Sequence, residues 1–314
     1  MHYYFAPMEG LTDSVYRRLH HKYFGGVDRY YMPFMSPTVH RALTPREARE
    51  LPCADSVAFQ AVPQLLTKVP EDFLWAAEQC RELGYREVNL NIGCPSGTVT
   101  AKGKGSGMLR DPDALDAFLY EIFSRAPLPI SVKTRIGFDS PEEFPRLVEI
   151  FNRYPICELT VHPRVRTQFY KGGVDMEAFR YALAHCKASL CYNGNLTSIT
   201  QIEAFQKEYP QVGSVMLGRG LIGDPGMLVP GGTAVSALEA FMEELLEEYA
   251  VVFGSHRNAM FRLKENWSLL CHRFEHSEKL TKKLRKCTDY TEFRSITREI
   301  LHTLQLAPAL QADW

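Results

Sequence analysis

Short apolar runs rich in β-branched and aromatic residues alternate along the chain with longer segments whose apolar residues recur at helical spacing. The short runs predict strands at residues 3–7, 29–33, 57–65, 87–91, 130–134, 158–162, 189–193 and 214–217. The spacers include segments 70–83 and 112–124, where Pro70 and Pro112 stand at the start of a helical period. Eight such strands with helix-length spacers predict an α/β fold, and the count favours a closed (β/α)8 TIM barrel over an open sheet.

The alternation stops after residue 220. Residues 223–232 are rich in glycine and proline, and from residue 236 onward the pattern predicts helices only, at 237–253, 258–274, 277–286 and 290–304. We therefore expect a barrel domain at residues 1–232 and a small all-helical bundle at residues 236–314, with the boundary at about 230–235.

Composition agrees with an ordinary globular protein, at 45% hydrophobic and 23% charged residues. No run approaches the roughly 18 consecutive apolar residues of a membrane helix, and the N-terminal residues do not resemble a secretory leader. We expect a cytoplasmic protein that acts as a monomer and does not bind a membrane. The eight cysteines show neither a CxxC pair nor a zinc-type Cys/His spacing, so reduced thiols and no metal site are expected.

Charge is unevenly distributed although the net charge is −1. Residues 237–250 hold five glutamates and no Lys or Arg, whereas residues 255–300 hold eleven Lys or Arg against six Asp or Glu. The second segment predicts a basic face, which suits either plain solvation or contact with an RNA backbone. Arg262, Lys264 and Trp267 have two interpretations, as RNA contacts or, for Trp267, as an anchor of the bundle.

Residues 88–109 carry the most specific chemistry. The strand ends in Asn89-Leu90-Asn91, and Cys94 follows at the turn into a loop rich in glycine, with Lys102 and Lys104. Strand ends of a barrel carry its chemistry, so Cys94 is a candidate catalytic thiol. A lone cysteine is more often an ordinary buried thiol, and this is our interpretation of the other seven.

Other strand ends are also polar or glycine-rich, and they converge on one face of a barrel. Loops with glycine after the last two strands typically bind phosphate, which Asn193-Gly194-Asn195 and Gly218-Arg219-Gly220 would do here. Lys133 would lie over the electron-rich ring of a ligand, and Gln64 would form a hydrogen bond with the edge of that ring. Together with the phosphate loops, this combination suits flavin mononucleotide (FMN). The alternatives are a solvated strand end for Lys133 and a structural role for His162.

These residues also carry a resemblance to a family. The chain resembles the tRNA-dihydrouridine synthases, flavin enzymes that reduce uridine in tRNA. The matching motifs are APMEGLTD at 6–13, PQLL at 63–66, NLNIGCPSGTVTAKGKGSGMLRDP at 89–112, VKTRIG at 132–137, VHPRVRTQFYKG at 161–172, YNGN at 192–195 and GRGLIGDP at 218–225. The similarity covers about residues 2–230, and RLKENW at 262–267 is the best match in the helical tail.

The resemblance implies that NADPH reduces a bound FMN, that the flavin passes hydride to C6 of a flipped uracil, and that Cys94 donates a proton to C5. It implies FMN contacts by Ala6, Pro7, Met8, Gln64, Lys133, His162, Asn193, Gly194, Asn195, Gly218 and Arg219. It implies substrate contacts by Asn89, Asn91, Lys102, Arg164 and Arg166. Two other functions stay open: a flavin barrel that reduces a free pyrimidine or enone, and a non-catalytic barrel that binds RNA or a ligand.

Overall fold

The computed structural model describes residues 1–310, and within them one fully parallel sheet has the strand order β3-β2-β1-β9-β8-β7-β6-β5-β4. The strands are β1 (His2–Phe5), β2 (Arg29–Tyr31), β3 (Gln60–Val62), β4 (Gln64–Leu65), β5 (Val88–Ile92), β6 (Ile130–Arg135), β7 (Leu159–His162), β8 (Leu190–Tyr192) and β9 (Ser214–Leu217). The helices of the barrel region are α1 (Ser14–Tyr23), α2 (Pro45–Glu50), α3 (Pro70–Glu82), α4 (Gly97–Thr100), α5 (Pro112–Arg125), α6 (Phe144–Phe151), α7 (Met176–His185), α8 (Ile199–Glu208) and α9 (Arg219–Gly223).

The sheet closes at Pro63. β3 and β4 end the strand order on opposite sides, yet they are consecutive in the chain and only Pro63 separates them. The Val62 carbonyl accepts from Met32 N–H at 2.9 Å on one side, and the Pro63 carbonyl accepts from Asn89 N–H at 2.8 Å on the other. The predicted strand 57–65 is therefore one interrupted strand of an eight-stranded barrel, although residues 57–59 lie outside it. The predicted TIM barrel is confirmed.

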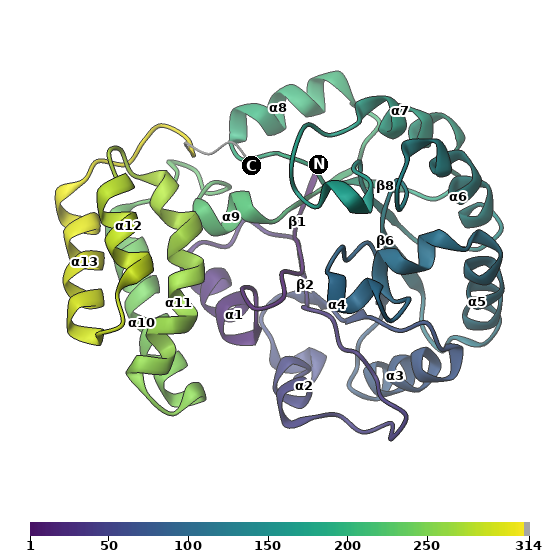
Figure 1. Ribbon diagram of the computed structural model, residues 1–314, viewed down its shortest axis with the longest axis horizontal. Helices are drawn as coiled ribbons and strands as arrows, with labels where there is room; N and C mark the ends of the chain where they lie inside the picture. Colours follow the sequence, from purple (N-terminus) through teal and green to yellow (C-terminus); the bar gives the residue numbers. More distant parts are fainter. Residues whose placement is uncertain (311–314) are drawn as a thin grey trace.

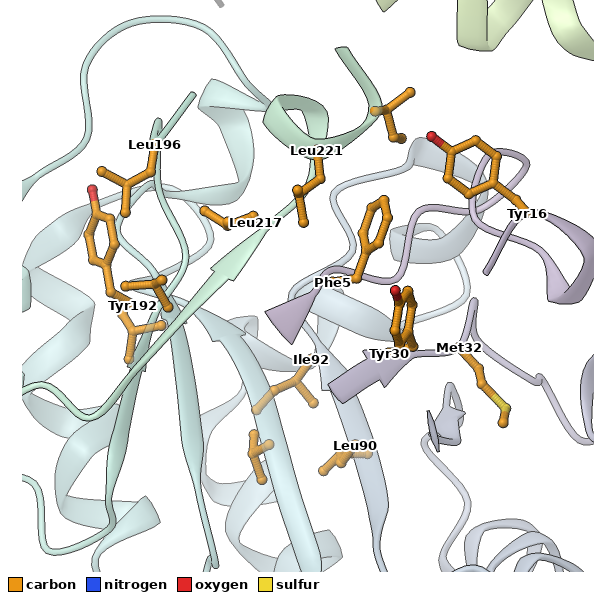
Figure 2. Close-up of a cluster of buried hydrophobic side chains, with 14 of the residues drawn as sticks. Phe5, Tyr16, Tyr30, Met32, Leu90, Ile92, Tyr192, Leu196, Leu217 and Leu221 are labelled. Atoms are coloured by element: carbon orange, nitrogen blue, oxygen red, sulfur yellow. The ribbon is translucent and has the colours of Figure 1, made fainter. Parts of the chain in front are cut away.

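Helices surround the barrel, which Figure 1 shows approximately end-on with α3, α5, α6, α7 and α8 around the strands. Side chains alternate between its two faces, as the pleat requires. Tyr4 and Tyr31 pack inside the barrel with Met216. Phe5 and Tyr30 point outward toward Tyr16 of α1, and Figure 2 shows this aromatic cluster. The outer face is therefore held by apolar packing against the helices.

The remaining helices, α10 (Val235–Phe253), α11 (His256–Leu270), α12 (Glu278–Lys286) and α13 (Tyr290–Thr303), lie together beside α1 and α9 (Figure 1). The four predicted helices are thus present, and each end lies within four residues of its prediction. The largest difference is at the end of α11, where a 3-10 turn, Cys271–Arg273, replaces the last predicted turn. No helix within residues 1–310 is both long enough and apolar enough to cross a bilayer. The division into two domains stays a prediction.

Polar contacts join the helical region to the barrel. Asp13 caps α1 by accepting from Tyr16 N–H at 3.0 Å, and it also accepts from the Tyr249 hydroxyl at 3.0 Å and pairs with Arg262 at 3.5 Å. Trp267 is 1% exposed, so it anchors the helical region within the core. Arg262 and Trp267 thus have structural contacts that the sequence had left open.

Candidate active site

A cavity of about 610 Å³ opens at the carboxyl ends of the strands, where a barrel carries its chemistry. Twelve of the predicted site residues line it: Ala6, Pro7, Met8, Asn91, Cys94, Lys133, His162, Asn193, Gly194, Asn195, Gly218 and Arg219. They come from the ends of six different strands and were separated by as many as 213 positions in the sequence, from Ala6 to Arg219. The volume suits a ligand larger than a single ring.

The loop that carries Cys94 is held by its neighbours in the chain. The Asn91 side-chain oxygen accepts from Gly93 N–H at 3.1 Å and from Cys94 N–H at 2.9 Å. The Cys94 carbonyl accepts from Ser106, from its N–H at 3.1 Å and its hydroxyl at 2.8 Å. Gly105 has φ +57°, and a Cβ there would lie only 3.0 Å from the same carbonyl oxygen. Glycine at this position therefore lets the loop pack closely against Cys94.

Two arginines also donate hydrogen bonds to backbone carbonyls of the same loop. Arg135 donates from Nε to the Gly93 carbonyl at 2.9 Å, and Arg166 donates from Nε to the Pro95 carbonyl at 3.2 Å. Burial raises the pKa of the Cys94 thiol, and the positive charges of Arg135 and Lys133 offset part of that rise. Cys94 is therefore a protonated thiol at neutral pH that reaches the cavity, as a proton donor must.

Lys133 lies on the cavity wall and is held by Asn193. Its Nζ donates to Asn193 Oδ1 at 2.6 Å, and the Asn193 amide donates in turn to the Met216 carbonyl at 2.7 Å. Burial, with a smaller contribution from Arg135, lowers the pKa of Lys133 to about 8. The hydrogen bond to Asn193 fixes the direction of the amine. Because burial disfavours its positive charge, a negatively charged ligand would stabilise the protonated amine.

His162 is a neutral hydrogen-bonding group. Arg164 is fully buried, and its guanidinium donates to His162 Nε2 at 2.9 Å and to the Gly172 carbonyl at 2.6 Å. Burial and the nearby cations Arg135 and Lys133 hold the pKa of His162 well below its usual range. With Nε2 accepting, the ring proton is on Nδ1. Arg164 therefore orients His162 and does not itself line the cavity.

Gln64 and Asn89 form a buried network behind Asn91. Asn91 donates to Gln64 Oε1 at 2.7 Å, Gln64 donates to Asn89 Oδ1 at 2.8 Å, and Asn89 donates to the Ser131 hydroxyl at 2.9 Å. Gln64 lines a smaller neighbouring cavity of about 150 Å³, whereas Asn89 is buried without lining either. Both residues therefore orient Asn91, the member of this network that lines the main cavity.

The end of the cavity formed by the last two strands is compact and cationic. A Cβ at Gly194 would fall 2.0 Å from the Tyr192 hydroxyl, and one at Gly218 would lie 3.1 Å from Met8 Sδ, so glycine keeps this wall open. Arg219 donates to Asn195 Oδ1 at 3.4 Å. Burial, together with the charge of Arg164, lowers the pKa of Arg219 to about 10, and the group stays a cation at neutral pH.

Eleven cavity residues were not among the predicted site residues: Glu9, Phe34, Gly93, Pro95, Ser96, Gly97, Thr98, Val99, Arg135, Phe169 and Tyr170. Arg135 had a signal, because it follows Lys133 by two positions and shares its face of β6. Phe169 and Tyr170 had only their place in a matched motif. Lys102 is exposed, and neither Lys102 nor Arg166 lines the cavity. Arg166 instead contacts the backbone of the Cys94 loop.

The fold and the cavity together define a (β/α)8 barrel whose cavity is lined by a thiol, a lysine and an arginine that lies beside two glycine-bearing loops. The dihydrouridine synthase family model matches residues 4–311, so the chain belongs to the dihydrouridine synthase family. Dihydrouridine synthases are flavin-dependent oxidoreductases, and the predicted family and enzyme class are confirmed.

Relatives agree with this assignment, and a solved structure agrees with the fold. The chain is 31% identical over 229 residues to a probable tRNA-dihydrouridine synthase of Rickettsia bellii, covering 71% of this chain and 68% of the relative. It is 28% identical over 282 residues to tRNA-dihydrouridine synthase B of Proteus vulgaris, covering 85% of each. An old yellow enzyme homologue from Zymomonas mobilis has a TM-score of 0.50 and 11% identity, covering 71% of this chain and 85% of that one, which supports the fold alone.

Proposed function

We propose that the chain reduces specific uridines in tRNA to 5,6-dihydrouridine, with FMN as cofactor and NADPH as reductant. The observation that supports this most is Cys94, a protonated thiol that lines the same cavity as Lys133, Arg219 and the glycine-bearing loops. The names of the relatives, tRNA-dihydrouridine synthases, support tRNA as the substrate.

The cavity residues fit FMN. The glycine-bearing wall at Gly194 and Gly218 leaves room for a phosphate, and Arg219 with Asn195 would bind it. Lys133, His162 and Asn193 would contact the ring system, and Ala6, Pro7 and Met8 form the wall at the end of β1. Gln64 would act at the ring edge or through Asn91. When bound and reduced by NADPH, FMN supplies the hydride for C6 of the uracil.

Cys94 then donates its proton to C5. Burial favours the thiol over the thiolate, so the proton is present at neutral pH, and the bonds from Asn91 and Ser106 fix the backbone from which Sγ projects. Of the five predicted substrate contacts, Asn91 is the one that lines the cavity. The other buried contacts would act indirectly. Asn89 would orient Asn91 through Gln64, Arg164 would orient His162, and Arg166 would hold the Cys94 loop.

The RNA body would contact basic groups outside the cavity. On α12, Lys279, Lys282, Lys283, Arg285 and Lys286 are all exposed. Lys102 is also exposed, in the loop that follows Cys94. Phosphate contacts by such groups supply most non-specific affinity for RNA. The bound uridine would have to leave its stack to enter the cavity.

The test begins with the visible spectrum of the purified protein and continues with mass spectrometry of tRNA from a strain that lacks the gene. We expect flavin bands and the loss of dihydrouridine at defined positions. Cys94→Ala should keep FMN and NADPH oxidation but form dihydrouridine about 10²- to 10⁴-fold more slowly. A colourless protein would contradict the cofactor, and turnover of free uridine or orotate equal to that of tRNA would favour a small-molecule reductase.

A further inference from the structure

A stack of alternating cations and aromatic rings runs beside the Cys94 loop. The Arg110 guanidinium lies 3.8 Å from the Phe138 ring centroid, and the Arg166 guanidinium lies 5.2 Å from Phe138 and 5.0 Å from Phe169. Arg166 also donates to the Pro95 carbonyl. Each layer fixes the next, because a guanidinium over a ring face is attracted by the ring quadrupole. Phe169 is the last layer and is therefore held in place from beneath.

Phe169 is unusual in both backbone and exposure. It has φ +52° and ψ −100°, a region that a bulky residue rarely adopts and that costs on the order of 1–3 kcal/mol. Its side chain is 41% exposed and lines the cavity. Packing in the core does not explain this conformation. The strained backbone instead presents an aromatic ring at the cavity.

The neighbouring Tyr170 has a different environment. Its ring has the Arg135 guanidinium at 5.4 Å and the Arg219 guanidinium at 5.0 Å, and His162 lies 6.1 Å away. Tyr170 thus lies beside Arg219, at the proposed phosphate site. Phe169 lies beside Arg166, which contacts the Cys94 loop. Two adjacent aromatic residues therefore serve two different parts of the cavity.

We propose that Phe169 is a stacking platform for the nucleobase next to the uridine that enters the cavity. This inference rests on the proposed function. An RNA strand that places one base beside Cys94 brings the adjoining nucleotides to the rim of the same cavity, where the ring of Phe169 is exposed. Flat apolar rings bind bases of any kind by stacking, and Arg166 beneath the ring adds positive charge near the RNA backbone.

The experiment measures the Kd of a substrate tRNA for the oxidised holoenzyme without NADPH, so that binding is separated from turnover. Loss of one stacked base corresponds to a Kd that is about 5- to 150-fold weaker. Phe169→Leu should show this loss, whereas Phe169→Tyr, which keeps the flat ring, should stay within about twofold of wild type. In turnover, Phe169→Leu should raise KM with kcat and FMN content retained.

Two controls separate stacking from damage to the fold. Phe169→Gly removes the ring and also relieves the positive φ, so it should be as stable as wild type yet lose the same tRNA affinity. The base that stacks on Phe169 lies on one side of the target uridine. A tRNA that is abasic at that nucleotide should bind wild type and Phe169→Leu equally, because it has no base to stack.

Equal Kd values for wild type and Phe169→Leu on intact tRNA would overturn the platform while leaving the proposed function in place. The same conclusion would follow if the difference between the two proteins persisted with an abasic nucleotide on either side. If the wild-type holoenzyme bound no tRNA, both the platform and the proposed function would be wrong.

Discussion

Lys133 Nζ donates to Asn193 Oδ1 across 2.6 Å, although the two residues belong to β6 and to the end of β8, with β7 between them in the sheet. The bond therefore spans β7 at the carboxyl ends of the strands. It fixes the direction of the amine while burial lowers the pKa of Lys133 to about 8. A lysine in this state is a strong partner for an anion only while it keeps its proton.

We expect FMN affinity of the apoprotein to depend on this proton. The amine is protonated below a pKa of about 8 and neutral above it, so affinity should fall as the pH rises from 7 to 9. Lys133→Met should weaken binding by about ten- to a hundredfold at pH 7, the loss of one charge-assisted hydrogen bond. Fluorescence titration of FMN at each pH measures both effects.

A matched control is Lys207→Met on α8, an exposed lysine away from the cavity, which should leave both affinity and pH profile unchanged. A Lys133→Met protein that kept the fall in affinity between pH 7 and 9 would show that another group controls it.

The reactivity of Cys94 should depend on Arg135. Arg135 holds the Gly93 carbonyl at 2.9 Å, and its charge lowers the pKa of Cys94 against the rise caused by burial. Arg135→Met should therefore raise the pKa of Cys94 and slow its alkylation by iodoacetamide below pH 8, because the thiolate is the nucleophile. Peptide mass spectrometry follows the alkylation of each cysteine separately.

Cys53 is exposed and supplies the control within the same sample, since its rate should not change. A faster rate at Cys94 in Arg135→Met would mean that loss of the brace opens the loop, and the electrostatic argument would then fail.

The glycine-rich loop should be sensitive at one glycine and tolerant at another. Gly105 has φ +57°, and a Cβ there would lie 2.9 Å from Val99 Cγ1 and 3.0 Å from the Cys94 carbonyl. We expect Gly105→Ala to lower the free energy of unfolding by about 1–3 kcal/mol. Gly97→Ala, with no atom within 4 Å of its Cβ, should change it by less than about 0.5 kcal/mol.

Urea denaturation of both proteins gives the comparison. Equal stability of the two variants would contradict the role of Gly105 as a close support for Cys94.

The strand-end residues could be predicted because strands of a parallel barrel end on one face, so Cys94, Lys133, His162, Asn193 and Arg219 meet wherever the chain places them in sequence. No comparable rule predicts which residues of separate loops contact one another. The brace from Arg135 to Gly93 and the position of Phe169 depend on how separate loops pack, which no periodicity encodes.

Two further features were not decided by the sequence. Pro63 divides one strand into β3 and β4, because its nitrogen cannot donate a hydrogen bond. The two parts pair with strands on opposite sides, and this pairing closes the sheet into a barrel. Trp267 had two open interpretations because an aromatic residue suits both a core and an RNA surface, and only its exposure of 1% decides for the core. Burial of a particular side chain is a tertiary property.

The junction between barrel and helices should depend on a buried ion pair. Arg273 Nε lies 3.0 Å from Asp224 Oδ2, with side chains only 10% and 8% exposed, and Asp224 also accepts from the Thr233 hydroxyl. Asp224→Asn keeps the shape but leaves the guanidinium buried without its counter-charge, which costs about 3–5 kcal/mol. We therefore expect its urea midpoint to fall well below that of wild type. Glu149→Gln, which breaks an exposed pair with Arg146, should change stability by about 1 kcal/mol or less, and an equally small change in Asp224→Asn would show that the junction does not depend on this pair.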